Sequence, residues 1–225
     1  MNRYTVRSLP DIASAPREWD DPFWENIPFL TVSQFRPESS SHRPKVLVKM
    51  VADLSAALVF FKVSDRYVRC TRTEYMSDVW NDSCVEWFVQ PKAGLGYFNF
   101  EVNCGGALHA SYVEDPTRLP GGALKKSTPL PPALGKTVTI FHSLPGTVDP
   151  EIAEPVEWYI SMRVPFPIFA PFIGPIGGLD GQEWHANFNK CADQTSHPHW
   201  ATWNPVSTLN FHRPGEFGMI RFEKT

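Results

Sequence analysis

The chain has 225 residues, a length typical of one large all-β domain or of two small domains. Hydrophobic residues make up 42% and charged residues 20%, so the chain can bury an ordinary core. The formal net charge of −3 gives no electrostatic reason to expect nucleic acid or an anionic membrane surface as a partner, and no stretch approaches the roughly 20 apolar residues of a membrane-spanning helix.

Proline and aromatic residues are abundant. The 22 prolines are well above the usual share of about 5% and favour many turns over long helices. The 8 Trp and 16 Phe indicate either a large core or aromatic platforms for a ligand. The polar N-terminus, MNRYTVRSLPDIASAP, has no apolar signal region. The chain is therefore expected to be soluble, and both a cytoplasmic protein and a secreted protein with a trimmed signal fit the sequence.

In chain order, residues 1–40 are expected to form an arm that packs on the rest of the protein, with Trp19 and Trp24 fixing it there. Short runs of alternating apolar and polar residues follow, separated by Pro, Gly, Asp and Ser, while no stretch of 12 residues has a helical period. Ten strands are predicted, at 45–51, 57–63, 66–73, 83–90, 97–103, 107–113, 136–142, 156–164, 184–190 and 217–223. This pattern predicts a single all-β domain over residues 1–225, an antiparallel β-sandwich of the jelly-roll or immunoglobulin-like kind.

Two segments, 165–183 and 191–216, are predicted to lack strands, and loops of that length are usually functional or cover a sheet edge. Trp158 and Trp184 alternate with polar neighbours in predicted strands and are expected in the core. The four cysteines form no CxxC motif, and with no sign of secretion free buried thiols are favoured over two disulfides at Cys70, Cys84, Cys104 and Cys191.

The predicted strands 83–90 and 97–103 flank a short loop, PKAGLG, and are expected to form a hairpin. Closing the hairpin across that loop places apolar residues opposite each other, in the pairs Val85 with Val102, Trp87 with Phe100 and Val89 with Phe98. A slip of one residue would mix apolar and polar residues on both faces, so the pattern supports this register.

The same register turns Glu86 toward Glu101 on the other face of the hairpin, although like charges in direct opposition repel each other. Further polar groups share that face, namely Gln90, Tyr97, Asn99 and Asn103. The face is either solvated or a binding surface for a polar ligand or a cation. Amide and carboxylate groups in close array suit sugar hydroxyls, which both donate and accept hydrogen bonds, and Trp80 at the rim suits the apolar side of a sugar ring.

Several motifs together resemble the carbohydrate-binding module family 9-like domains over nearly the full chain. They are DPFW (21–24), LVFFKVSDRYV (58–68), VWNDSCVEWFVQP (79–91), YFNFEVNCGG (97–106) and the tail WHANFNKCADQTSHPHWATWNP…NFHRPGEFGMIRF (184–222). The resemblance implies a β-sandwich that binds a mono- or oligosaccharide without catalysis and that in relatives is usually attached to a glycan-active enzyme. It also implies that two aromatic residues clamp a terminal sugar over a polar sheet face. Trp80 would be the first of them, Glu86 would accept a hydroxyl, and either Trp200 or Trp203 would complete the clamp.

The resemblance also allows bound groups, since some members hold structural calcium and related sandwiches hold haem between a Met and a His. Met76 is a candidate haem ligand without an evident His partner. Calcium prefers oxygen ligands, and an oxygen-rich turn offers Asp78, Asn81 and Asp82, although such residues also serve ordinary turn chemistry.

Two other chemistries are weighed from the residues themselves. Glu86 and Glu101 could be the two carboxylates of a glycosidase, but adjacent acids on one sheet face suit a binding floor better. A zinc site would draw on residues late in the chain, Cys191, His197, His199 and His185, but their spacing matches no standard zinc pattern. Oligomeric state is left open by the sequence.

Overall fold

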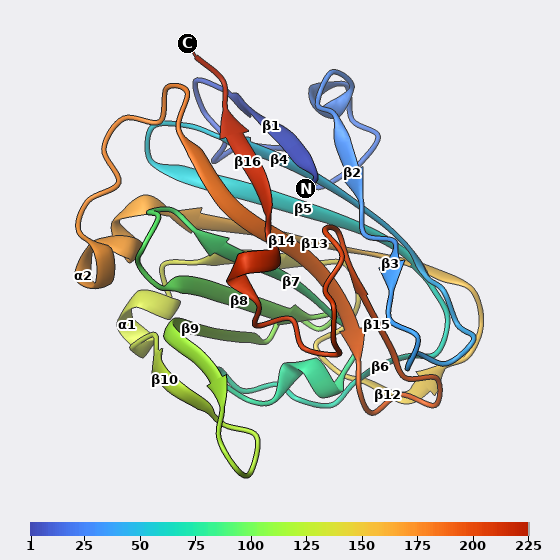
Figure 1. The fold of residues 1–225 in the computed structure, drawn as a ribbon. Helices are drawn as coiled ribbons and strands as arrows, with labels where there is room; N and C mark the ends of the chain where they lie inside the picture. Colours follow the sequence, from blue (N-terminus) through green and yellow to red (C-terminus); the bar gives the residue numbers. More distant parts are fainter. Residues whose placement is uncertain (225) are drawn as a thin grey trace.

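The computed structural model describes residues 1–224, which form two β-sheets that pack face to face (Figure 1). The first sheet, called sheet I, contains in spatial order β10 (Leu124–Pro129), β9 (Leu108–Arg118), β8 (Tyr97–Asn103), β7 (Cys84–Gln90), β14 (Glu183–Ala192) and β16 (Gly218–Phe222). The second, sheet II, contains β4 (Lys45–Ala52), β5 (Ala56–Asp65), β13 (Val156–Pro165) and β11 (Thr139–His142). The predicted all-β sandwich is confirmed, and every strand pair named here is antiparallel.

One short strand joins the two sheets. The first four residues of β1 (Arg3–Ser8) pair in parallel with β16, and its last two residues pair in parallel with β4. Figure 1 shows β1 beside β16 although they lie at opposite ends of the sequence. The N-terminal segment thus does more than lie across the sandwich, because its first strand belongs to the hydrogen-bonded framework.

The remaining elements are short. The other strands are β2 (Phe29–Thr31), β3 (Gln34–Phe35), β6 (Val68–Cys70), β12 (Val148–Ile152) and β15 (His199–Thr202). The helical turns are η1 (Pro22–Trp24), η2 (Val79–Asn81), α1 (Pro132–Gly135), η3 (Phe166–Phe169), α2 (Ala170–Ile173) and η4 (Pro214–Glu216). No helix among residues 1–224 is long and apolar enough to cross a membrane.

The predicted hairpin register is confirmed residue by residue. Val85 pairs with Val102 and Glu86 pairs with Glu101 between β7 and β8. The apolar face of this hairpin turns into the space between the sheets, where Trp87 and Phe100 stack with ring centroids 5.7 Å apart. Its other face is the outer face of sheet I.

The core and the arm contain the tryptophans expected there. Trp158 and Trp184 are fully buried between the sheets. Trp19 and Trp24 pack on Phe60 of β5, with centroid distances of 5.3 and 5.2 Å, and so hold the N-terminal segment against the outer face of sheet II. The four cysteines are buried free thiols, as predicted.

The number of strands was underestimated, because sixteen lie in the described residues instead of about ten. The two segments predicted to lack strands also contain structure, since 165–183 includes η3 and α2 while 191–216 includes β15 and η4. The missed strands have weak patterns. β10 reads LKKSTP and is almost entirely exposed, so no apolar alternation marks it, and β15 is only four residues long.

Candidate functional site

A row of polar side chains crosses the outer face of sheet I. Strand pairing places five residues side by side, one from each of five adjacent strands, in the order His109, Glu101, Glu86, Asn189 and Thr202. We call these five the polar row. Residues paired across neighbouring strands point to the same face of a sheet, so the backbone register alone brings this row together.

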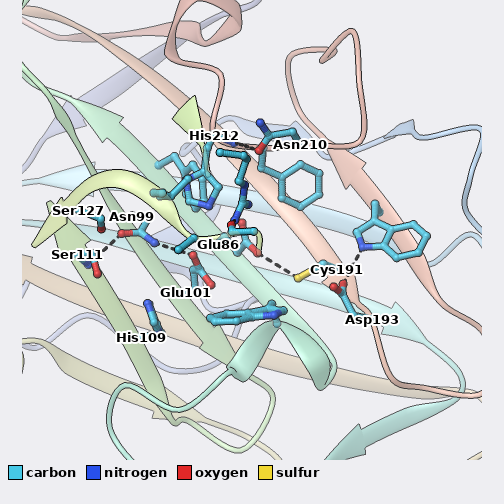
Figure 2. Close-up of a pocket in the computed structure, with 18 of the residues that line it drawn as sticks. Glu86, Asn99, Glu101, His109, Ser111, Ser127, Cys191, Asp193, Asn210 and His212 are labelled. Carbon is cyan, nitrogen blue, oxygen red and sulfur yellow. Dashed lines mark hydrogen bonds between the residues drawn. The ribbon is translucent and has the colours of Figure 1, made fainter. Parts of the chain in front are cut away.

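A cavity of about 820 Å³ lies over part of this face, a size within the range of ligand-binding pockets. The strands of sheet I supply its floor, and loops supply its walls. Figure 2 shows Glu86 and Glu101 next to each other, with Asn99 and Ser111 on one side and Cys191 and Asp193 on the other. The walls come from η2 and the loop before it, from the β9–β10 hairpin, from β15 and from the segment before η4. They include Met76, Trp80, Arg118, Trp200, Leu209, Asn210, Phe211 and His212.

The two central carboxyls are almost fully buried, with 3% of Glu86 and 4% of Glu101 exposed. Glu86 accepts hydrogen bonds from Asn189 Nδ2 at 3.1 Å and from Cys191 Sγ at 3.0 Å, and Glu101 accepts one from Asn99 Nδ2 at 2.6 Å. Burial raises the pKa of both carboxyls, and the neighbouring Glu101 charge raises the pKa of Glu86 further. The pair therefore favours keeping a proton, which gives the floor a donor as well as acceptors.

The cysteines beside this pair are thiols. Cys84 and Cys191 face each other between β7 and β14, and their sulfurs lie within 4.8 Å of each other and of a Glu86 oxygen. Burial raises the pKa of Cys84 to about 12 and raises that of Cys191 as well. Metals bind the thiolate form, so this group favours hydrogen bonding over metal ligation in the folded protein.

The aromatic walls are held in place by Asp193. The indole Nε1 of Trp200 donates to Asp193 Oδ1 at 2.6 Å, and the backbone N–H of Asp193 donates to the carbonyl of Trp80 at 3.0 Å. Trp80 also packs edge-on against His109, with centroids 5.1 Å apart. One residue thus connects the two indole-bearing elements, η2 and β15.

Five of the eight predicted site residues line this cavity together, namely Trp80, Glu86, Asn99, Glu101 and Trp200. Three others lie elsewhere. Trp203 is buried in the core against Phe188, with centroids 5.6 Å apart, so Trp200 is the late tryptophan at the cavity. Tyr97 lies beneath the cavity wall, its hydroxyl 2.7 Å from His212 Nδ1, and Asn103 is fully buried beside Asp82.

Sequence reasoning missed several lining residues. His109 and Ser111 belong to the predicted strand 107–113, and extending the register from β8 across the short turn would have placed them opposite Glu101 and Asn99. Asp193 and the segment from Leu209 to His212 come from loops with no periodic pattern, and nothing in the sequence signals their position.

The residues suggested for calcium do not form a cation site. Asp82 is fully buried, and its carboxylate accepts hydrogen bonds from the Arg72 backbone N–H and from Asn103 while pairing with the Arg72 guanidinium at 3.2 Å. Asp78 is exposed and makes no capping bond at η2. The oxygens of Asp82 are thus committed to protein donors, and the calcium hypothesis for this turn is not supported.

The suggested zinc ligands do not converge. Cys191 lies on the outer face of sheet I, His199 is buried on the inner face, and His197 stacks on Tyr67 with centroids 3.6 Å apart. His185 lies nearer the other end of β14, paired with Met219 of β16. These residues therefore cannot share one ion.

A second group of possible ligands at the sandwich end, His42, Asp65 and His199, already contains a cation. The Lys190 ammonium lies 2.9 Å from His199 Nε2 and 3.6 Å from Asp65 Oδ2.

Met76, the candidate haem ligand, lines the cavity, where its sulfur accepts a hydrogen bond from the Ala110 N–H at 3.3 Å.

Comparison with known proteins agrees with this architecture. A carbohydrate-binding protein candidate from Bacteroides uniformis ATCC 8492 is 27% identical and superposes with a TM-score of 0.82 over 98% of this chain and 99% of its own. A family 9 carbohydrate-binding module from Caldicellulosiruptor kristjanssonii has been solved with cellotriose and with glucose. The cellotriose complex is 13% identical to this chain and the glucose complex 12%, and each superposes with a TM-score of 0.65. Both alignments cover all of this chain, and they cover 95% and 97% of the respective modules. These two structures support the fold.

No curated protein matches the chain. The model of carbohydrate-binding family 9 matches residues 23–222, which include both sheets and all of the cavity walls and floor described above. The chain therefore belongs to carbohydrate-binding family 9.

Proposed function

We propose that the chain is a non-catalytic carbohydrate-binding domain that holds a sugar in the cavity over sheet I. The observation that carries the proposal is the combination of a buried polar floor with two indoles at one cavity of about 820 Å³. The solved relatives in complex with glucose and cellotriose support the ligand class.

The floor suits hydroxyl groups. Each sugar hydroxyl donates and accepts, and the floor presents amide, hydroxyl and carboxyl groups from neighbouring strands. Asn99, Glu101 and Glu86 are already connected to neighbours by hydrogen bonds, so their positions are fixed before a ligand arrives. Preorganised partners reduce the entropy cost of binding.

The walls suit the C–H surface of a sugar ring. Trp80 and Trp200 are half-buried, which leaves part of each ring available to a ligand, and both line the cavity. Aromatic rings bury apolar surface while their polar atoms stay hydrogen-bonded, as in the bond from Trp200 to Asp193. In the proposed complex these two residues contact the ring, and Glu86 and Glu101 contact its hydroxyls.

The test is calorimetric titration of the protein with glucose, cellobiose and cellotriose. Replacement Trp80→Ala is expected to weaken binding by about 2 kcal/mol, roughly thirtyfold, because an aromatic contact at the cavity is lost. Phe29→Ala is the control, since Phe29 is 57% exposed and lies outside the cavity.

Absence of binding to every sugar of a broad glycan panel, or binding that Trp80→Ala leaves intact, would refute the proposal. Hydrolysis of a glycan by the wild-type protein that disappears in Glu86→Gln and Glu101→Gln would instead identify these carboxyls as a catalytic pair.

A further inference from the structure

Negative groups predominate around the cavity. Three carboxyl groups line it, those of Glu86, Glu101 and Asp193. Glu86 and Glu101 form no ion pair with any Lys, Arg or His within residues 1–224, and the hydrogen bonds they accept all come from uncharged donors on Asn99, Asn189 and Cys191. A buried carboxylate without a cationic partner is costly, so a ligand that brings a positive charge to this floor would reduce that cost.

The basic residues nearby compensate the floor only in part. Burial raises the pKa of Glu101, and the His109 and Arg118 charges offset some of that rise without forming an ion pair with it. Arg118 is exposed at the rim, and its Nη1 donates to the carbonyl of Gly122 at 2.5 Å in the same hairpin. Burial and the neighbouring Arg118 and His109 lower the pKa of His212 to about 3, so this imidazole is neutral. His109 lies opposite Glu101, where its Nδ1 is 3.3 Å from the Ser77 carbonyl and its ring packs on Trp80.

The polar row also has more acceptors than donors. Asn189 Oδ1 is buried without a hydrogen-bond partner, next to the amide nitrogen that serves Glu86. Each carboxyl in the row offers two oxygens, whereas the donors that reach them are two amides and one thiol. A hydroxyl brings acceptors as well as a donor, whereas an ammonium brings three donors, a positive charge and no acceptor.

We propose that the cavity prefers a sugar bearing a protonated primary amine, a hexosamine, over the neutral sugar of the same shape. The ammonium lies against Glu86 and Glu101, and the ring carbons lie against the indoles. This inference rests on the proposed sugar-binding function and names the ligand class of the same site.

Binding of the amine is also expected to release a proton from the pair formed by Glu86 and Glu101. The raised pKa of Glu86 and Glu101 means that the pair keeps a proton to a higher pH than free carboxyls do. An ammonium beside them favours release of that proton, because it stabilises both carboxylates. Asp193, whose pKa burial also raises, faces the same space with Cys191, His109, His212 and Arg118, and the fully buried Cys84 lies beside Glu86 and Cys191. The displaced proton leaves to the buffer, so the heat of binding depends on the ionisation enthalpy of the buffer.

The experiment titrates the wild-type protein at pH 6.5 with glucosamine, glucose and N-acetylglucosamine. A charged hydrogen-bonded contact is expected to make glucosamine bind about tenfold or more tightly than either neutral sugar. Repeating the glucosamine titration in two buffers of different ionisation enthalpy should show net proton release.

Glu101→Gln preserves the shape of the floor and removes one charge. The ratio of glucosamine to glucose affinity is expected to fall to about one in this variant. Glu183→Gln is the matched control, because Glu183 is exposed on β14 outside the cavity, and it should leave the ratio unchanged.

Equal affinities for glucosamine and glucose in the wild-type protein would overturn the inference and leave the proposed sugar binding intact. The comparison of three ligands uses the wild-type chain alone, so it decides the question even if Glu101→Gln fails to fold. Failure to bind any sugar would instead count against the proposed function itself.

Discussion

Glu86 and Glu101 place two carboxyls side by side in a buried position, which opposes folding when both are charged. Their pKa values in the folded protein are raised above the usual value of about 4.5, so the folded state holds protons that the unfolded chain releases. The free energy of unfolding therefore falls as pH rises from about 4.5 through the raised pKa values. Such a cost is typical of residues that are kept for binding and not for stability.

Glu101→Gln tests this cost. The variant is expected to be more stable than the wild type at pH 8, by on the order of 1–2 kcal/mol, because it removes one of two opposed buried charges. At pH 4.5 and below the difference should shrink, since the raised pKa values favour the protonated form of both wild-type carboxyls there. Urea unfolding at the two pH values measures the effect, and an equal difference at both would contradict it.

Trp200 and Trp203, the two tryptophans near the end of the chain, are expected to have separate roles. Trp203→Ala is expected to lower the free energy of unfolding by about 3–5 kcal/mol, because it leaves a cavity beside Phe188 in the core. Trp200→Ala should cost much less stability, since Trp200 is only half-buried, but should weaken sugar binding. Denaturant unfolding and calorimetric titration of both variants separate the two effects, and similar stability losses would contradict the assignment.

Titration of His199 makes the free energy of unfolding depend on pH in the acidic range. Burial and the Lys190 charge lower its pKa to about 3, so the folded protein keeps it neutral while the unfolded chain protonates it near pH 6.5. Stability from this group is fully present above pH 6.5 and is lost as pH falls toward 3. His199→Gln should therefore reduce the slope of unfolding free energy against pH between 6 and 4.5 by about 1.4 kcal/mol per unit.

Guanidinium unfolding at several pH values measures that slope. Glutamine retains an acceptor for the Lys190 ammonium, so the variant tests titration without removing the hydrogen-bond partner. An unchanged slope would show that His199 takes up its proton in the folded state as well.

At the scale of elements, the sequence predicted the parts of the site that strands carry. Alternation in β7 and β8 set which residues face outward and placed Glu86 against Glu101. The same reasoning could not separate Trp200 from Trp203, because only two residues lie between them at the end of a short strand that has no marked pattern. Asp193, Phe211 and His212 reach the cavity through loops whose course depends on tertiary packing, which a single sequence does not encode in any periodic form.

At the scale of the whole molecule, β1 holds the two sheets together along one edge. Val6 is fully buried, and the Tyr4 hydroxyl donates to the Pro28 carbonyl at 2.7 Å. Deleting residues 1–8 should lower the midpoint of urea unfolding markedly, because the strand links β16 to β4 and buries apolar surface from both sheets.

A control deletion at the tip of the β9–β10 hairpin, residues 119–122, removes an exposed turn without touching either sheet core. This deletion should shift the midpoint of urea unfolding far less than the deletion of residues 1–8. Equal shifts for the two deletions would show that β1 contributes no more than a surface loop.

The polar row has a consequence for how the protein responds to its ligand. Its members come from strands that lie between residues 84 and 202 of the chain, and they meet only when five strands are aligned in one register. A sugar that spans the row thus binds the native state and not partly ordered forms. By thermodynamic linkage, a ligand present at one hundred times its dissociation constant adds about 2.7 kcal/mol to global stability. Thermal melting can then rank sugars by affinity without any label.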